Sequence, residues 1–471
     1  MSSEIFAQIR ELKQQGKYVE AWNFGFSAFQ NEPTNTYLRT SLFWVCYAAI
    51  KAVQESVLAR QNKAPNSNEQ SIVNSWINCI GQLNLSVPCD ELDYRFFNLF
   101  KGCGEHYQTY IQMLIFYGPN LYQQNDFKPY QTDKGEYPSL VTRLARQTSK
   151  AWLMHHKEWD LNLDGILNFL QYALDNALDR NKTWLQFDIS KCLVSVNRYD
   201  EARSAALSVL RKKMTESWAW GALADTYLSE DPNAAIACYC KGIAEAHEPP
   251  FCIPMYFGLA KLFSNKQEFE LASASLSKLI EIYNANGWQL KPEHNELVQQ
   301  PWFDASAIEA VDIGAEIRNR SNNALQYATE KLDMVIGIVD AHHRSGKGFS
   351  IYVDLNKKLS ARQGVFFGKG LPEIGTWLEV KLAKDGDEIE VLEAHKIDEQ
   401  TNGKVATVEG NLKLNSKGFG FIDDAFIAPF LLKGYQNQEF IRAIKIWDLD
   451  PKKGTPSWRV IKVEKSNLSN E

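Results

Sequence analysis

The run from Lys417 to Ile422, with the sequence KGFGFI, is the part of the chain whose residue types point most directly to a chemical role. Side chains alternate between the two faces of a β-strand, so Lys417, Phe419 and Phe421 are expected on one face. Phe426 lies in the next expected strand and would join them across a hairpin. Exposed aromatic rings stack on bases and lysine contacts phosphate, so the pattern indicates binding of single-stranded nucleic acid.

The two glycines of this run, Gly418 and Gly420, are expected to face inward, where a missing side chain permits tight curvature. A fainter copy, KGFSI, occupies residues 347–351, and a second aromatic element follows it after a longer hairpin. A histidine precedes the copy and either stacks on a base or is an ordinary exposed turn residue. The candidate nucleic-acid-binding residues are Lys417, Phe419, Phe421, Phe426, Lys413, Lys347, Phe349, Phe366 and His342.

The sequence contains no recognisable catalytic or metal-binding motif. Gly-x-Ser-x-Gly, His-Glu-x-x-His and Gly-x-Gly-x-x-Gly are all missing, and the segment 344–348 lacks two of the residues that a phosphate-binding loop needs. No two cysteines have the Cys-x-x-Cys spacing of zinc ribbons. We therefore predict a protein that is no enzyme and uses no metal or cofactor. The cysteines, expected to be buried and reduced, are Cys46, Cys79, Cys89, Cys103, Cys192, Cys238, Cys240 and Cys252.

Charge is distributed unevenly along the 471 residues. The chain has a net charge of −6, yet residues 331–471 hold 21 basic and 20 acidic side chains. Neither part is strongly basic, so nucleic-acid affinity would depend on stacking and local patches more than on bulk charge. No apolar run approaches the roughly 20 residues that span a bilayer, and the first residues do not form a secretory signal. We expect a cytoplasmic protein that does not enter the membrane.

Residues 1–325 show helical periodicity almost throughout, and a repeat is clearest at residues 184–284. A large residue, Leu, a small residue and Tyr precede Ala, an aromatic residue and Gly in the segment 220–242. Ala202, Ala235 and Ala272 stand 33 and 37 residues apart. This pattern resembles tetratricopeptide repeats, which implies an α-solenoid whose groove grips a protein partner. An irregular helical domain with chance alanine spacing is the other interpretation.

From about residue 333 the period changes from 3.6 to 2, and two units follow at 333–398 and 404–466. The second resembles a cold-shock domain, a small OB-fold barrel, on KGFGFI and on the segment 424–428. The resemblance implies nucleic-acid contact by Lys417 and the three phenylalanines already named. Leu412 and Ala428 stand where that family has tryptophan and histidine, which implies weaker binding or a changed ligand. The first unit is expected to be a divergent copy.

Together these patterns predict a helical solenoid followed by two small OB-fold-like β-barrels. The expected function is a non-enzymatic adaptor that binds single-stranded RNA or DNA through its barrels and a protein through its solenoid. The architecture also resembles helical-repeat proteins encoded in bacterial conflict and defence loci. Two alternatives stay open: a pure protein scaffold whose aromatic barrel face is buried in an interface, and a non-catalytic subunit that presents nucleic acid to an enzyme in trans.

Overall fold

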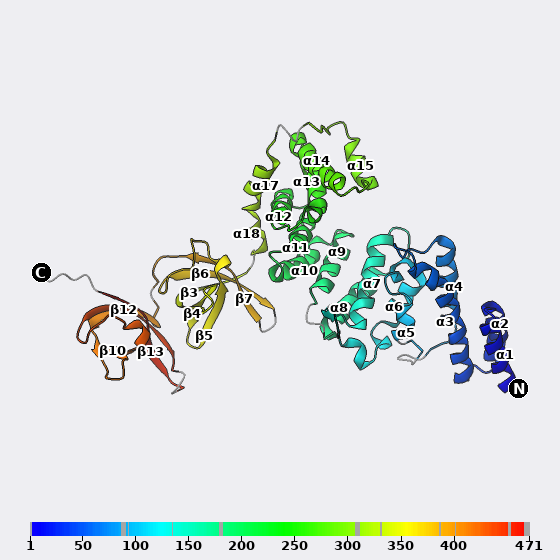
Figure 1. Cartoon of the computed structure of the whole chain (residues 1–471), viewed down its shortest axis with the longest axis horizontal. Coiled ribbons are helices and arrows are strands. Elements are labelled where there is room, and N and C mark those ends of the chain that lie inside the picture. The colour runs from blue at the N-terminus through cyan, green and yellow to red at the C-terminus, as the bar shows by residue number, and fades with distance from the viewer. Residues whose placement is uncertain are drawn as a thin grey trace. The chain divides into compact units, whose positions relative to one another are not determined.

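A computed structural model describes most of the chain. The described residues are 2–85, 91–92, 94–133, 135–178, 182–306, 311–329, 332–385, 388–400, 402–450 and 454–465, so that Cys89 lies outside them. The chain divides into a helical unit, Met1–Ala324, and a β unit, Leu325–Glu471. The predicted order, a helical region followed by two small curled sheets, is confirmed (Figure 1).

The first half of the helical unit consists of helices of unequal length that pack around one continuous core. The longest of these helices is α3, whose buried Phe43 packs against Phe96, which in turn packs against Phe100. Its elements are α1 (Ser2–Gln14), α2 (Tyr18–Asn31), α3 (Thr36–Leu58), α4 (Ser67–Gly81), α5 (Tyr94–Asn98), η1 (Gly104–His106), α6 (Gln108–Tyr117), η2 (Gly118–Leu121), η3 (Gln124–Phe127), β1 (Tyr130–Thr132), β2 (Gly135–Tyr137), α7 (Leu140–His155) and α8 (Leu163–Asn176).

The second half contains three successive helix pairs, each formed by neighbours in the chain. Ala202, Ala235 and Ala272 lie in the second helix of each pair and are fully buried. Small buried residues let the paired helices approach closely, as the repeat pattern required. The elements are α9 (Thr183–Val194), α10 (Tyr199–Lys212), α11 (Ser217–Asp225), α12 (Pro232–Ala244), η4 (Pro249–Cys252), α13 (Ile253–Asn265), α14 (Phe269–Ala285), α15 (Pro292–Val298), α17 (Ile313–Ser321) and α18 (Ala324–Ala328).

One close contact joins the second and third helix pairs. A Cβ atom at Gly258 on α13 would lie 2.5 Å from the ring of Tyr239 on α12, well inside any real carbon–carbon contact. Tyr239 in turn donates a hydrogen bond of 2.6 Å from its hydroxyl to Asp225 Oδ1 on α11. The glycine therefore fixes how closely neighbouring pairs stack.

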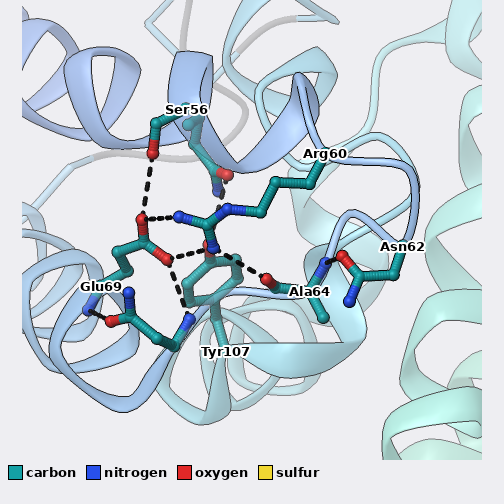
Figure 2. Close-up of polar contacts among 8 residues, drawn as sticks. Ser56, Arg60, Asn62, Ala64, Glu69 and Tyr107 are labelled. Atoms are coloured by element: carbon teal, nitrogen blue, oxygen red, sulfur yellow. Dashed lines mark hydrogen bonds and ion pairs between the residues drawn. The ribbon is translucent and has the colours of Figure 1, made fainter.

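A polar network holds the turn between α3 and α4 (Figure 2). Arg60 donates two hydrogen bonds to the Glu69 carboxylate, at 2.8 and 2.5 Å, and a third to the Ala64 carbonyl at 3.0 Å. Glu69 also accepts from Ser56 and from the backbone of Asn66, whose side chain caps α4 in return. These bonds, above all those from Arg60, lower the pKa of Glu69 to about 2.

The substitution Glu69→Gln should lower the free energy of unfolding of the helical unit by about 1–3 kcal/mol at neutral pH. The folded pKa lies below the unfolded value near 4.5, so this stabilisation is complete above pH 4.5 and is lost as the pH falls toward 2. Urea titrations followed by circular dichroism at pH 7, 5 and 4 should show the difference from wild type shrinking at the lowest pH. Glu55→Gln, at an exposed pair with Lys51, is the control and should change little. An equal loss of unfolding free energy at every pH would contradict the lowered pKa of Glu69.

The first sheet of the β unit has five antiparallel strands in the order β5-β4-β3-β6-β7. A parallel bridge between Phe366 and Ala394 joins the segment after β5 to β7, so the two ends of the order approach each other and the sheet curls. The elements are β3 (Asp333–His342), β4 (Gly348–Asp354), β5 (Lys357–Arg362), η5 (Gln363–Val365), β6 (Trp377–Asp385) and β7 (Glu388–Lys396).

The second sheet has the order β8-β12-β13-β11-β10-β9. Its two end strands, β8 and β9, are consecutive in the chain and separated only by Leu412, so the sheet closes on itself around a small core. Among the described strand pairings of this sheet, β11 with β13 is parallel and the others are antiparallel. The elements are β8 (Val405–Asn411), β9 (Lys413–Leu414), β10 (Gly420–Ile422), β11 (Ala425–Ile427), η6 (Pro429–Leu431), β12 (Phe440–Leu449) and β13 (Pro456–Lys465).

The two sheets of the β unit pack against each other at a sheet junction. Its apolar part consists of Ile338, Tyr352 and Trp377 from the first sheet and Val405, Ile446 and Ile461 from the second. The Tyr352 hydroxyl donates a hydrogen bond to the backbone carbonyl of Trp447.

Four charged side chains complete the sheet junction. Lys358 lies 2.7 Å from Asp448 and 3.1 Å from Asp340, and Arg459 lies 3.3 and 3.1 Å from the same two carboxylates. Both aspartates are buried. The sheet junction therefore combines an apolar contact with a closed set of four alternating charges, and it holds the two sheets in one arrangement.

Candidate nucleic-acid interface

Three aromatic rings gather on the outer surface of the second sheet. The ring centres of Phe419, Phe421 and Phe426, which we call the phenylalanine cluster, lie 5.7 to 5.9 Å from one another. Phe421 and Phe426 are 37% and 36% exposed, and Phe419 is half-buried. Apolar rings that pack on one another and still face solvent offer flat surfaces for a ligand with its own flat rings.

Strand alternation explains how these rings reach the surface. Along β10 and β11 the outer residues Phe421 and Phe426 each stand between two fully buried neighbours. The strands pair Phe421 with Phe426, Phe421 with Lys413, and Phe426 with Arg459. Residues paired across neighbouring strands project on the same side of a sheet. One row therefore runs from Lys413 through two phenylalanines to Arg459 at the sheet junction.

The glycines of KGFGFI have different roles from those expected. Gly420 faces the core, where an added Cβ would lie 2.9 Å from Leu412 and 3.1 Å from Leu432. Gly418 was expected to face inward too, and this is wrong: it lies in an open turn with a φ of +84° that only glycine adopts easily. Lys417 belongs to the same turn because β10 begins only at Gly420, so it lies in the loop that precedes the strand and not on the strand itself.

Two lysines flank the phenylalanine cluster without a carboxylate partner in the part of the chain that the structure describes. Lys413 stands beside Phe421 in the row, Lys417 lies in the adjoining turn, and both are exposed. Of the two acidic residues in the β10–β11 turn, Asp424 is paired with Lys445 at 2.8 Å. The unpaired ammonium groups are free to contact phosphate.

At two positions this chain lacks the aromatic side chains, tryptophan and histidine, that cold-shock domains have there. Leu412 is fully buried in the core of the second sheet, between β8 and β9. Ala428 is half-buried after β11 and carries no group able to stack or to donate a hydrogen bond. The phenylalanine cluster thus acts without the tryptophan and histidine that the resemblance would have supplied.

The prediction that Phe349 contacts nucleic acid is wrong, because its side chain is fully buried in the core of the first sheet. Strand β4 has the opposite phase to β10: Phe349 and Ile351 point inward, and Ser350 lies on the outer side. A shift of one residue in phase sends every side chain to the other face. Phe366 is also poorly placed, since it is half-buried and packs at 6.3 Å against Phe349.

The remaining candidates of the first sheet are exposed but isolated from other rings. Lys347 lies in the turn before β4. The His342 ring donates a hydrogen bond of 2.8 Å through Nε2 to the Pro372 carbonyl, which fixes its orientation. Lys358 on β5 is paired with the two aspartates of the sheet junction. The first sheet therefore offers positive charge without a stacking surface of the second sheet's kind.

Three exposed aromatic residues of the β unit were not among the predicted binding residues: Phe367, Phe430 and Phe440, the last of which is 42% exposed at the start of β12. Phe430 is 70% exposed in η6, directly after β11. Phe367, 53% exposed, stacks on His395 with ring centres 4.3 Å apart. Phe430 keeps the alternate spacing of Phe426, which is the signal that could have marked it, but Pro429 interrupts the strand between them.

The described ranges contain no cluster of three or more His, Cys, Asp and Glu side chains that could hold a metal ion. All of the cysteines within these ranges are free thiols, and burial raises the pKa of Cys240 to about 12, which makes it a poor nucleophile. No helix among the described residues is long and apolar enough to cross a membrane.

Two segments of the chain match models of known families. Residues 406–463 match the model described as S1/CSD-like domain 2 of the TOTE conflict systems. Over these residues the second sheet is similar to an S1/CSD-like domain. This match covers β8 to β13 and includes the whole phenylalanine cluster, and it supports the cold-shock resemblance of KGFGFI. Residues 183–324 match a domain of unknown function, DUF7017, which begins at α9.

Among solved structures, the chain is similar to the crystal structure of BtubC (BKLC) from P. vanneervenii. The sequence identity is 11% and the TM-score 0.30, over 53% of this chain and 93% of that chain. No curated protein matches the chain.

Proposed function

We propose that the S1/CSD-like domain binds single-stranded RNA or DNA by stacking bases on the phenylalanine cluster. The observation that carries the proposal is the packing of three rings within 6 Å of one another, two of them more than one third exposed. Base–aromatic stacking contributes about 1–3 kcal/mol per base and tolerates any sequence, because every base has a π-face. Lys413 and Lys417 lie where they would contact the phosphates on either side.

The rings favour single strands over duplexes. Bases in a duplex are stacked on one another and present only their edges, whereas unpaired bases can be splayed out onto a protein surface. The β unit is also close to neutral overall, with 21 basic and 20 acidic residues from residue 331 onward. Nonspecific attraction to a duplex backbone is therefore weak, and stacking supplies the larger share of the affinity.

We further propose that the chain is a non-enzymatic adaptor whose helical unit binds a protein partner. The packed helix pairs α9 to α14 form the kind of scaffold that presents an extended surface to other proteins. The S1/CSD-like match is to a domain of the TOTE conflict systems, which favours a role in such a system. In this view the adaptor brings single-stranded nucleic acid to the partner.

Fluorescence anisotropy with the full chain tests the nucleic-acid part of the proposal. Labelled oligonucleotides of one sequence, as single-stranded DNA, single-stranded RNA and duplex DNA, are titrated at near-physiological salt. We expect saturable binding of at least one single strand and clearly weaker binding of the duplex. Binding of the duplex alone, or of no oligonucleotide, would reject the proposal.

The salt dependence of binding should be shallow. For single strands the slope of log K against log salt concentration is about −0.7 per neutralised phosphate, so Lys413 and Lys417 together predict a contribution of roughly −1.4. Each of Lys413→Gln and Lys417→Gln should reduce the magnitude of the slope by about 0.7. Lys51→Gln, at an exposed position on α3, is the matched control and should leave the slope unchanged. If the slopes of both lysine variants equal that of the wild type, the phosphates do not contact Lys413 or Lys417.

A further inference from the structure

A small basic cavity lies in the helical unit, which does not contain the phenylalanine cluster. Its volume is about 150 Å³, and four of its lining side chains are cationic: Lys101, Arg143, Arg146 and Lys150. The first 330 residues as a whole carry 30 basic and 37 acidic residues. Four cationic side chains therefore gather around one cavity in a part of the chain whose net charge is negative.

The cavity is built on one face of α7. Arg143, Arg146 and Lys150 follow the spacing i, i+3, i+7, which aligns side chains along one side of a helix. Gln147 on the same face is fixed, because its amide donates to the Phe100 carbonyl at 2.8 Å and accepts from the Tyr110 hydroxyl at 3.2 Å. This wall is therefore rigid before any ligand arrives.

Two other segments close the cavity opposite α7. Lys101 comes from the turn after α5, and Tyr137 ends β2. The ammonium group of Lys101 lies 4.8 Å from the centre of the Tyr137 ring, and the guanidinium group of Arg143 lies 5.3 Å from it. Two cations of like charge are thus held against a single ring.

The charges of the cavity are only partly balanced. Arg146 is paired with the buried Asp188 at 2.8 Å, and Lys150 lies 3.8 Å from Glu105. Lys101 and Arg143 have no carboxylate partner among the described residues, and the Nε atom of Arg143 is buried without a hydrogen-bond acceptor. A buried guanidinium donor without an acceptor is costly, and an anion in the cavity would relieve that cost.

We propose that the basic cavity binds a phosphate group. A phosphate presents oxygens in several directions, which suits donors that converge from α7 and from Lys101, and arginine is well matched to it. The cavity exceeds the roughly 10–15 Å³ that one water needs, yet it is smaller than the roughly 300 Å³ of sites that enclose whole ligands. The phosphate therefore enters while the rest of its molecule stays outside, as with the terminal phosphate of an oligonucleotide or of a free nucleotide.

The test uses full-length protein with all three rings replaced, Phe419→Ala, Phe421→Ala and Phe426→Ala, so that stacking on the phenylalanine cluster cannot contribute. Binding of pyrophosphate, of ATP without magnesium, and of one short oligonucleotide with a 5′-phosphate or a 5′-hydroxyl is measured by calorimetry. We expect pyrophosphate to bind, and Arg143→Gln and Lys101→Ala each to weaken that binding about tenfold or more. Arg318→Gln, an exposed arginine on α17, is the matched control and should leave it unchanged.

The two sources of the phosphate are separated by the same experiment. Preference for the 5′-phosphorylated oligonucleotide over the 5′-hydroxyl form would identify a nucleic-acid end as the ligand, and binding of ATP without that preference would identify a free nucleotide. Arg143 has no carboxylate partner to lose, so Arg143→Gln should unfold at the wild-type temperature. No binding of any phosphate compound, or binding that both cavity variants retain, would overturn the proposal. Neither result depends on whether the phenylalanine cluster binds single strands.

Discussion

Replacing both Phe421 and Phe426 by alanine should lower the affinity for a single-stranded oligonucleotide by about 30-fold or more. Each ring offers one base a stacking surface worth about 1–3 kcal/mol, and two such losses at the lower limit already amount to about 30-fold in affinity. Both side chains lie on the outer surface of short strands whose neighbours fill the core. The double variant should therefore keep the thermal stability of the wild type to within a few degrees.

The matched control for this experiment is Phe116→Ala, because Phe116 is 81% exposed but belongs to the helical unit. It should bind the oligonucleotide as the wild type does. If the double variant folds and binds with unchanged affinity, bases do not stack on Phe421 or Phe426. If it also loses a protein partner that the wild type retains, the exposed rings form a protein interface, as the scaffold alternative requires.

Asp448→Ala should destabilise the β unit by about 1–3 kcal/mol, less than the loss of one partner from a fully buried ion pair, because Lys358 and Arg459 keep 37% and 34% of their side chains exposed. Asp448 contacts both Lys358 and Arg459, so its loss leaves two cations sharing the single buried carboxylate of Asp340. Urea titration of the full chain, followed by tryptophan fluorescence and limited proteolysis, should show the β unit unfolding at lower urea concentration. Asp398→Ala, at an exposed position between the sheets, is the control and should change little.

The effect of Asp448→Ala should also depend on pH. Burial raises the pKa of Asp448, but the hydrogen bond and the charge of Lys358 lower that pKa by a larger amount. The pKa of Asp448 therefore lies below its usual value near 3.8. A lowered pKa means that the stabilisation is complete above about pH 4 and is lost as the pH falls. The difference between wild type and variant should therefore be constant from pH 8 to 5 and narrow in stronger acid. A difference that grows on acidification would contradict the ion-pair account.

The phenylalanine cluster could be predicted because its signal is local. Alternation along a strand and across a hairpin already placed Phe421 and Phe426 together, and neither needs a distant partner to be exposed. The strand boundary could not be predicted in the same way. Lys417 and Gly418 fit a strand by alternation alone, but the positive φ of Gly418 begins a turn that the residue pattern does not distinguish from an inward-facing glycine.

The first sheet shows why a resemblance in sequence did not transfer to a site. Phe349 aligns with Phe419 in the motif, but the phase of a strand is set by which of its faces packs on the core, and here the register shifts between Val339 and Ala341 on the neighbouring strand. Contacts between segments far apart in the chain could not be predicted from the sequence either. Asp340 and Asp448 are ordinary acidic residues in the sequence, and the sheet junction appears only when both sheets are folded.

The basic cavity of the helical unit was not predicted from the sequence, although part of its lining follows from helix geometry. The spacing of Arg143, Arg146 and Lys150 follows from a helix, but such a stripe usually faces solvent. Lys101 and Tyr137 join the stripe only through the packing of α5 and β2 beside α7. The unpaired state of Arg143 depends on where every nearby carboxylate points, which periodicity does not contain.

The most direct test of the central claim is photo-crosslinking of the full chain to a single-stranded oligonucleotide that carries 5-iodouracil. Irradiation joins this base to an aromatic side chain on which it stacks, and mass spectrometry then identifies the residue. Stacking on the phenylalanine cluster predicts adducts at Phe419, Phe421 or Phe426, removed by an excess of unlabelled single strand. Adducts confined to other residues, such as Phe367 or the helical unit, from a chain that binds the oligonucleotide, would contradict the claim.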